Sequence, residues 1–502
     1  MNKKKKLSLY EKFFFIILAI RDLLSLLISL DYRIFTGIMR YANPLYLNII
    51  SAASARRAYS RAIKNVPAYK AFIDFRNTND IPEMDKENYI KAYSIDKRCV
   101  GGKIPSNKVM IDESSGSTGT PFNWIRTQAE RRKSLGSISY FSRYCFNNNF
   151  DIVINAFSMG SWATGINMGR ALEHNAIVKN TGPDLEKIIK TMQFFGPQYK
   201  YLILGYPPFL KQVVDTAENY GFPLQTFNLR ALVGGEGMSE GLRDYLLQHF
   251  QQVYSGYGAS DIEIGLAGET PLSVAIRRLA RENDAVKKAI FGTDSRLPMV
   301  FQYNPLEHHI EVNENGELLF TINRGSVLSP RIRYNIHDQG GIADFHQMQK
   351  YLRNLNIDIK ALDCESTFWL RLPFLWVFGR KDFTISIMGA NIYPEDIEQC
   401  VYADKQLSEI TRSFFQSVVE KEGNKIRPAF YFEISVDPSK DLEFKFQTSI
   451  IENLKKINLD FREAWKEYSD TLLPEIHLYK IGDGPFKMVP GQIKQRRMLK
   501  PQ

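Results

Sequence analysis

The sequence predicts an α/β protein that has a large amino-terminal domain built on parallel sheet and a small α+β carboxy-terminal domain. From about residue 105, short aliphatic runs alternate with amphipathic stretches, a pattern typical of parallel strands covered by helices on both faces. The clearest runs are Asp151–Phe157, Tyr201–Gly205 and Leu229–Gly234, the last followed by a helix-like segment, Glu240–Phe250. Beyond Gly379 a smaller unit with a different order of elements begins.

Composition is compatible with a multidomain globular protein. The chain has 502 residues, of which 44% are hydrophobic and 24% charged. The net charge of +10 is compatible with nucleic acid, an anionic membrane surface or anionic small molecules as partners. The sequence shows neither zinc-spaced Cys and His nor a helix-turn-helix signature, so we do not expect nucleic-acid binding. The four cysteines are scattered, which favours a reducing cytoplasm.

The amino terminus, residues 1–40, is basic and then apolar. Lys3–Lys6 precede the apolar stretch Phe13–Leu30, which Arg21 and Asp22 interrupt. Four polar residues recur at every fourth position and predict one narrow stripe on an otherwise apolar helix: Arg21, Ser25, Ser29 and Arg33. Three interpretations remain open, namely a helix on the inner face of the membrane, a helix packed on the body or on a second subunit of a homodimer, and a signal-anchor.

The remaining elements follow from periodicity and turn residues. Residues 40–100 read as helical with an interruption at Pro67, and Asn315-Gly316 predicts a hairpin turn within His309–Thr321. The small unit is predicted to contain a strand-turn at Phe383–Asn391, a helix from Pro394, a strand at Ala429–Ile434, a long helix at 443–464 and a strand at Ile476–Tyr479. We therefore expect three parts, residues 1–40, 41–379 and 380–502, with a hinge near Arg380.

The segment Asp112–Pro121 (DESSGSTGTP) is the strongest candidate for a phosphate-binding loop. Glycines let backbone N–H groups approach a polyphosphate, and hydroxyls donate to its oxygens. The spacing is not that of a P-loop, and a plain surface turn is the alternative. The candidate ligand-binding residues are Ser114, Ser115, Gly116, Ser117, Thr118 and Gly119.

The order SSGSTGTP resembles the first core motif of adenylate-forming enzymes, in particular the branch of phenylacetate-coenzyme A ligase and CapK-like proteins. Six further segments resemble motifs of this branch in the same chain order, and the resemblance covers about residues 50 to 500. These segments are Ile81–Tyr89 (IPEMDKENY), Gly234–Met238 (GGEGM), Tyr254–Asp261 (YSGYGASD), Gly316–Thr321 (GELLFT), Arg331–Asp338 (RIRYNIHD) and Gly379–Glu398 (GRKDFTISIMGANIYPEDIE).

This resemblance implies an acid-thiol ligase that uses ATP and Mg²⁺ to convert a carboxylic acid to an acyl-adenylate. The acyl group would then pass to coenzyme A or to the phosphopantetheine of an acyl carrier protein, after the small domain rotates about its hinge. A role in surface-polysaccharide or secondary-metabolite synthesis is implied for this branch.

The resemblance also assigns roles to residues around the nucleotide. Asp338 would accept hydrogen bonds from the ribose hydroxyls, and Arg380 would contact the ribose or a phosphate. Tyr257 and Gly258 would form the adenine wall, with glycine allowing close approach.

For the metal, Asp261 occupies the position of the usual glutamate, with Glu263 as an alternative ligand for Mg²⁺. Glu236 would contact the metal or the adenine amino group, or is a plain turn residue ahead of a helix capped by Ser239.

Two further sets of residues concern catalysis. The expected walls of the acyl pocket are aromatic, namely Phe141, Tyr144, Phe157, Trp162, Tyr206 and Phe209. The resemblance implies a catalytic lysine near the carboxy terminus, but Gln492 occupies its position, and Lys494 or Lys487 would have to replace it. The alternative function is a catalytically impaired nucleotide- or acyl-binding scaffold at the membrane.

Overall fold

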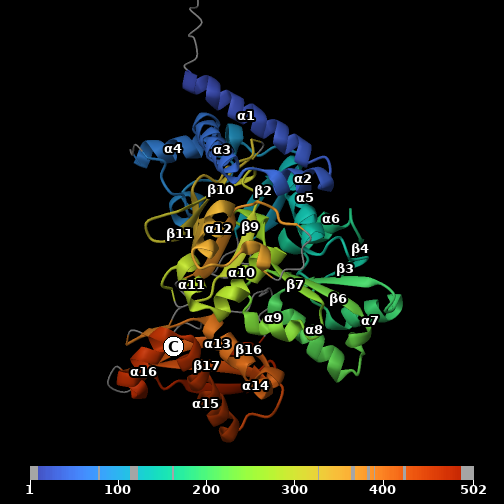
Figure 1. Ribbon diagram of the computed structural model, residues 1–502, viewed down its shortest axis with the longest axis vertical. Helices are drawn as coiled ribbons and strands as arrows, with labels where there is room; N and C mark the ends of the chain where they lie inside the picture. Colours follow the sequence, from blue (N-terminus) through green and yellow to red (C-terminus); the bar gives the residue numbers. More distant parts are fainter. Residues whose placement is uncertain are drawn as a thin grey trace, which may run out of the picture.

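The computed structural model describes residues 9–76, 80–113, 122–160, 163–294, 296–325, 327–362, 368–380, 385–388, 390–421 and 425–487. It shows an elongated body with the first helix at one end and the carboxy-terminal elements at the other (Figure 1). The α/β class predicted from the sequence is confirmed.

A large mixed sheet runs through the body. In the described part of the chain it has 11 strands in the order β10-β11-β12-β13-β9-β8-β7-β6-β5-β3-β4. The strands are β3 (Ile152–Asn155), β4 (Ile177–Asn180), β5 (Lys200–Gly205), β6 (Asn228–Gly234), β7 (Gln252–Ala259), β8 (Glu263–Gly268), β9 (Met299–Tyr303), β10 (His308–Val312), β11 (Glu317–Ile322), β12 (Tyr334–Ala343) and β13 (Phe374–Arg380). The three aliphatic runs identified in the sequence form β3, β5 and β6, and Asn315-Gly316 lies in the turn of the β10–β11 hairpin.

The prediction of a parallel sheet is right for only part of this sheet. Strands β4, β3, β5, β6 and β7 pair in parallel, whereas every pairing from β7 to β10 is antiparallel. The inner parallel strands β3, β5 and β6 are near-continuously buried, as expected where helices cover both faces, whereas the edge strand β4 is mostly exposed. The helices of the body are α5 (Gln128–Cys145), α6 (Ala163–Leu172), α7 (Leu185–Phe195), α8 (Pro207–Asn219), α9 (Glu240–Leu246), α10 (Pro271–Glu282), α11 (Asp284–Phe291) and α12 (Phe345–Arg353).

Four helices precede the body: α1 (Leu9–Ile28), α2 (Tyr32–Tyr41), α3 (Pro44–Asn65) and α4 (Pro67–Arg76). Pro67 begins α4 and separates it from α3, as predicted. The expected polar stripe is not continuous, because the chain turns after α1 and Arg33 belongs to α2. Its first members, Arg21 and Ser25, are buried against the protein. None of the helices in the described ranges combines the length and apolarity that crossing a membrane requires.

A short antiparallel hairpin stands beside the large sheet. It consists of β1 (Val109–Glu113) and β2 (Asn123–Thr127), with Glu113 paired to Asn123. The candidate phosphate-binding loop, Ser114–Gly119, is the connection between these two strands and lies outside the described residues. The described flanks of the loop therefore fix where both of its ends meet the body.

The carboxy-terminal part contains β14 (Ile385–Ile387), β15 (Ala390–Ile392), α13 (Pro394–Ala403), α14 (Lys405–Ile410), β16 (Thr411–Lys421), β17 (Lys425–Ile434), α15 (Lys440–Ile457), α16 (Leu459–Leu472) and β18 (Glu475–Lys480). The prediction of one long helix at 443–464 is wrong. Asn458 separates α15 from α16, and its side chain caps α16 by accepting from the N–H of Phe461.

The carboxy-terminal part packs on the body mainly through α13, which lies against α9 (Figure 1). The backbone N–H of Ser239 donates to Oε2 of Glu398 at 3.0 Å. Tyr402 of α13 packs against Tyr245 with ring centroids 5.9 Å apart. These contacts place the small part directly beside the turn that follows β6.

Candidate active site

Tyr257 and Asp338, two residues predicted to bind the nucleotide, meet in the structure. Tyr257 lies on β7 and its hydroxyl donates to Oδ2 of Asp338 on β12 at 2.6 Å. The Tyr257 ring stacks on Phe301 of β9, with centroids 5.5 Å apart and an interplanar angle of 27°. Burial and the Asp338 carboxylate raise the pKa of Tyr257 well above its ordinary value. The tyrosine therefore stays protonated and acts as a donor.

Strand pairing places Arg380 next to this pair. In the register of β12 and β13, Asp338 lies opposite Arg380, and the pairing shifts at Gln339/Gly340. Asp338 thus lies within a strand, β12. Of Arg380 the structure describes the backbone, which ends β13 at the predicted hinge.

Gly258 allows a close approach, although not the one expected. A Cβ atom at this position would lie 2.7 Å from the carbonyl oxygen of Glu263 and 2.9 Å from the N atom of Gly265. The glycine therefore lets β8 pack closely against β7. This backbone contact is a structural reason for glycine that is separate from any contact with adenine.

Asp261 lies in the turn between β7 and β8. Its Oδ2 accepts a hydrogen bond from the hydroxyl of Tyr334 at 3.2 Å and lies 3.5 Å from Nζ of Lys86. Lys86 is the lysine of the segment Ile81–Tyr89, so two matched segments far apart in sequence meet here. Nζ of Lys86 also lies 4.9 Å from the ring centroid of Phe122, the first described residue after the candidate loop.

The environment of Glu263 differs from that of a metal ligand. Its carboxylate is 3% exposed and contacts Arg324 and Nε2 of His308. Burial alone would raise the pKa of Glu263, but Arg324 and His308 outweigh it and lower the pKa to about 2. Glu263 is thus an internal ion-pair partner, and we no longer retain it as an alternative ligand for magnesium.

Glu236 lies in the turn after β6 and directly follows Gly234 and Gly235, which line the cavity described below. Together with burial, its charge raises the pKa of Tyr206 to about 12. Ser239 caps α9 by accepting from the N–H of Leu242, as predicted. Neither a metal role nor an adenine role for Glu236 is decided by these contacts.

The base of the candidate loop is fixed by a buried ion pair. Nη1 of Arg126 on β2 lies 2.6 Å from Oδ2 of Asp112 on β1, and Asp112 is 1% exposed. Nη2 of Arg126 donates to the carbonyl oxygens of Ser260 and Ile262 at 2.5 and 3.2 Å. The same guanidinium thus joins the loop hairpin to the turn that carries Asp261. Sequence reasoning missed this pair, although Asp112 is the first residue of the quoted segment Asp112–Pro121.

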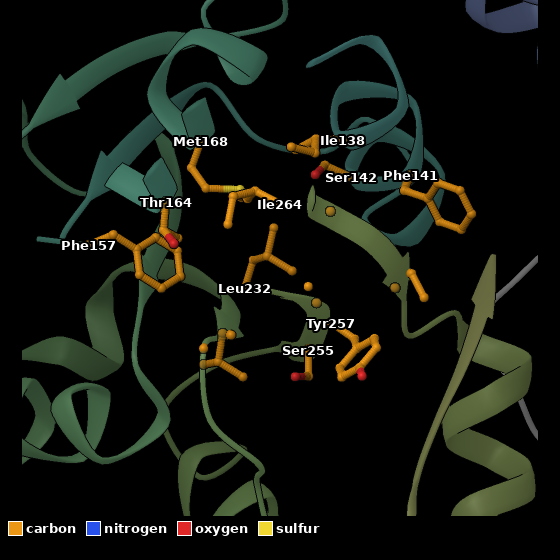
Figure 2. Close-up of a pocket in the computed structure, with 18 of the residues that line it drawn as sticks. Ile138, Phe141, Ser142, Phe157, Thr164, Met168, Leu232, Ser255, Tyr257 and Ile264 are labelled. Carbon is orange, nitrogen blue, oxygen red and sulfur yellow. The ribbon is translucent and has the colours of Figure 1, made fainter. Parts of the chain in front are cut away.

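A cavity of about 130 Å³ lies between α5, α6 and the central strands. Figure 2 shows Met168, Leu232 and Ile264 converging on it between Phe157 and Phe141, with Tyr257 at one side. Gly256, Gly258 and Ser260 of the Tyr254–Asp261 segment also line it, as does Glu113, the last described residue before the candidate loop. An apolar chamber therefore adjoins the nucleotide-binding candidates.

Three of the six aromatic residues expected in the acyl pocket line this cavity: Phe141, Phe157 and Tyr206. Tyr144 is instead buried with its hydroxyl donating to the carbonyl of Phe368, and Phe209 packs against a different part of the core. Trp162 lies outside the described residues. Sequence reasoning missed Met168, Leu232 and Ile264 as cavity residues, because buried aliphatic side chains have the same pattern in a solid core.

Of Lys487, Gln492 and Lys494, the structure describes Lys487. Gln492 and Lys494 lie outside the described residues. Lys487 is exposed after Phe486, whose ring packs against Phe415 of β16 at 4.6 Å. In the described ranges, no hydrogen bond or ion pair joins Lys487 to Asp261, Tyr257 or Asp338.

A protein-only cage for a metal ion is also not found in the described part of the chain, where no three His, Cys, Asp or Glu residues are suitably grouped. Magnesium at nucleotide sites is usually held by one or two carboxylates together with substrate phosphates. The half-buried Asp261 fits that arrangement, because its hydrogen bond from Tyr334 and its ion pair with Lys86 both use Oδ2.

No family model matches the sequence, and no curated protein matches it. Solved structures do match the fold. 2-Hydroxyisobutyryl-CoA ligase in the postadenylation state matches with a TM-score of 0.67 when bound to 2-HIB-AMP and 0.64 when bound to R3-HIB-AMP. Both matches have 13% identity and cover 92% of this chain and 91% of the ligase. The same ligase in the thioesterification state matches with a TM-score of 0.54 and 14% identity, covering 93% and 92%. The chain thus has the fold of an acyl-CoA ligase over nearly its whole length.

Proposed function

We propose that the protein activates a carboxylic acid with ATP, forming an acyl-adenylate and pyrophosphate, and then transfers the acyl group to a thiol. The observation that carries the proposal is the Tyr257–Asp338 hydrogen bond at the edge of an apolar cavity, with Arg380 opposite Asp338 in the sheet. The Tyr257 ring would face the adenine, and the Asp338 carboxylate would accept from the ribose hydroxyls. The cavity beside them would hold the acyl group. The fold shared with a ligase that binds 2-HIB-AMP supports this arrangement.

In the proposed reaction, the residues of the site bind ATP and orient it toward the acid. Asp338 holds the ribose, and Tyr257 fixes the direction of that carboxylate while its ring faces the adenine. Asp261, with Glu236 as a further candidate, would hold Mg²⁺, which when bound offsets phosphate charge. The candidate loop, Ser114–Gly119, would bind the phosphates. The strands that flank it are joined by the ion pair between Asp112 and Arg126.

The cavity indicates the class of acid. An apolar cavity of about 150 Å³ accommodates benzene, so about 130 Å³ suits a small ring or a short branched acyl chain. Its described charged lining consists of two carboxylates, Glu113 and Glu269, the second paired with Arg243. A second carboxylate on the substrate would be repelled, so we propose a small apolar monocarboxylic acid.

The acceptor is proposed to be coenzyme A or a carrier-protein phosphopantetheine, as in the phenylacetate-coenzyme A ligase and CapK-like branch that the motifs resemble. A place in surface-polymer or secondary-metabolite synthesis belongs to the same proposal. The small part packs on α9, and the TM-score over the whole chain is 0.67 with the postadenylation state of 2-hydroxyisobutyryl-CoA ligase and 0.54 with its thioesterification state. We infer that the small part moves between the two steps of the reaction. Thiol transfer would then require α13 to leave α9.

The decisive experiment is acid-dependent exchange of ATP with pyrophosphate across small aromatic, short branched and long-chain fatty acids. We expect exchange with the first two classes and its loss in Asp338→Ala. If ATP binds but no acid supports exchange, and Lys487→Ala and Lys494→Ala change nothing, the enzyme proposal is wrong. The protein would then be the impaired binding scaffold that Gln492 suggests.

A further inference from the structure

Helix α1 is attached to the body by its polar side. Arg21 is 3% exposed, and its Nη2 donates to the carbonyl oxygens of Leu306 and Asn323 at 3.1 and 3.3 Å. Nη1 of Arg21 also donates to Asp22, which is held in turn by Arg57 of α3 at 2.9 Å. These contacts fix the helix along the surface of the body, at the end remote from α14, α15 and α16 (Figure 1).

The opposite side of α1 is apolar and exposed. Six large residues, five on the helix and the last in the turn that follows it, are 46 to 64% exposed and form what we term the outer face of α1: Phe13, Ile16, Ile20, Leu23, Leu26 and Leu30. They recur at intervals of three and four positions, so they form one stripe about 20 Å long between Phe13 and Leu26. A helix on a protein surface normally turns its polar face to water and its apolar face to the protein. A continuous exposed apolar stripe therefore indicates an interaction site.

Positive charge is concentrated in the same region of the chain. Residues 1–66 contain 12 Lys and Arg against three Asp and Glu, a net charge of +9 out of +10 for the whole protein. Lys3–Lys6 directly precede the helix, and Arg33 and Arg40 are exposed on the next helix. The remaining 436 residues are therefore almost neutral.

We propose that the outer face of α1 inserts into the interface of an anionic lipid bilayer, with the surrounding Lys and Arg residues contacting the headgroups. Apolar insertion and electrostatic attraction are the two contributions that stable peripheral binding requires. A second copy of the chain is a poorer occupant, because pairing two outer faces would bring two regions of +9 together. The anchored Arg21 keeps α1 parallel to the bilayer surface. This proposal does not depend on the enzymatic one.

The test is cosedimentation of the full-length protein with phosphatidylcholine vesicles, with and without phosphatidylserine. We expect binding to the phosphatidylserine vesicles and its weakening as salt is raised. The triple variant Ile16→Asp/Leu23→Asp/Leu30→Asp should lower the partition coefficient by about tenfold or more for each side chain. A matched control, Phe194→Asp/Phe444→Asp, changes two residues on α7 and α15 that are more exposed than the outer-face residues, and it should bind like the wild type.

The midpoint of thermal unfolding separates insertion from internal packing. Because the three outer-face residues are exposed, their replacement should leave the midpoint unchanged. A second variant, Lys3→Ser/Lys4→Ser/Lys5→Ser/Lys6→Ser, leaves the helix intact and should weaken binding by about fivefold per lysine. The proposal is overturned if the wild type does not sediment with anionic vesicles, or if the triple variant binds as well as the control. It is also overturned if the triple variant abolishes a concentration-dependent dimer while vesicle binding is absent.

Discussion

Replacing Tyr257 with Phe tests whether the Tyr257–Asp338 pair forms part of a nucleotide site. The change removes the hydroxyl that donates to Asp338 at 2.6 Å and keeps the ring that stacks on Phe301. A hydrogen bond to a charged group contributes about 1.5–3 kcal/mol. Asp338 is only partly buried and water can replace the lost donor, so we take the lower end of that range. ATP affinity should therefore fall about tenfold.

The measurement is the equilibrium dissociation constant for ATP by titration calorimetry without any acid present. Tyr144→Phe is the matched control, because that hydroxyl also makes one hydrogen bond, at 2.8 Å to the carbonyl of Phe368, away from Asp338. It should cost a similar amount of stability and leave ATP binding unchanged. Equal ATP affinity in Tyr257→Phe and wild type, or an equal loss in both variants, would show that the pair does not serve the nucleotide.

Three further predictions concern ionisable groups. Arg126→Met leaves Asp112 buried without its partner, so calorimetric unfolding should show a loss of about 3 kcal/mol, together with loss of exchange; a stable variant would contradict the anchoring role. Asp261→Ala should raise the magnesium concentration required for half-maximal exchange. Glu263→Gln should reduce stability and leave that magnesium concentration unchanged. If Glu263→Gln raises the magnesium requirement and Asp261→Ala does not, Glu263 is the ligand. Burial raises the pKa of Asp396 to about 7 from 3.8, so between these values the unfolded state loses a proton that the native state keeps, and stability should fall as pH rises. Measured by chemical denaturation, the free energy of unfolding of the wild type should fall by about 1.4 kcal/mol per pH unit over this range relative to that of Asp396→Asn. Parallel pH profiles of the two proteins would contradict this prediction.

The sequence predicted individual elements well where local pattern determines them. The runs that form β3, β5 and β6, the Asn315-Gly316 hairpin and the helix beginning at Pro394 are all found. The predicted helix at 443–464 failed because Asn458, unremarkable in the pattern, caps a second helix. The antiparallel pairings beyond the β10–β11 hairpin also escaped prediction, since strand order depends on contacts between distant segments.

In the candidate site too, the sequence identified residues, whereas contacts between distant segments determine how they meet. Motif order identified Tyr257, Asp338 and Arg380 as residues of one site, but their contact depends on the pairing of β12 with β13 and on the packing of β7 nearby. Lys86 lies within a matched segment, yet only the fold brings it to Asp261. Motifs thus indicate which residues belong together, and the sheet register determines how they touch.

Helix α1 shows why periodicity alone gives the wrong picture of a surface. The spacing of Arg21 and Ser25 correctly places them on one side of the helix, and a polar stripe is ordinarily the side that meets water. Here two backbone carbonyls, of Leu306 and Asn323, accept from the guanidinium and turn that side toward the protein. These acceptors lie almost 300 residues away in the sequence, so no local pattern could reveal them. Once Arg21 faces inward, geometry requires the aliphatic residues of α1 to face outward, and the outer face of α1 is a direct consequence of that one anchored side chain.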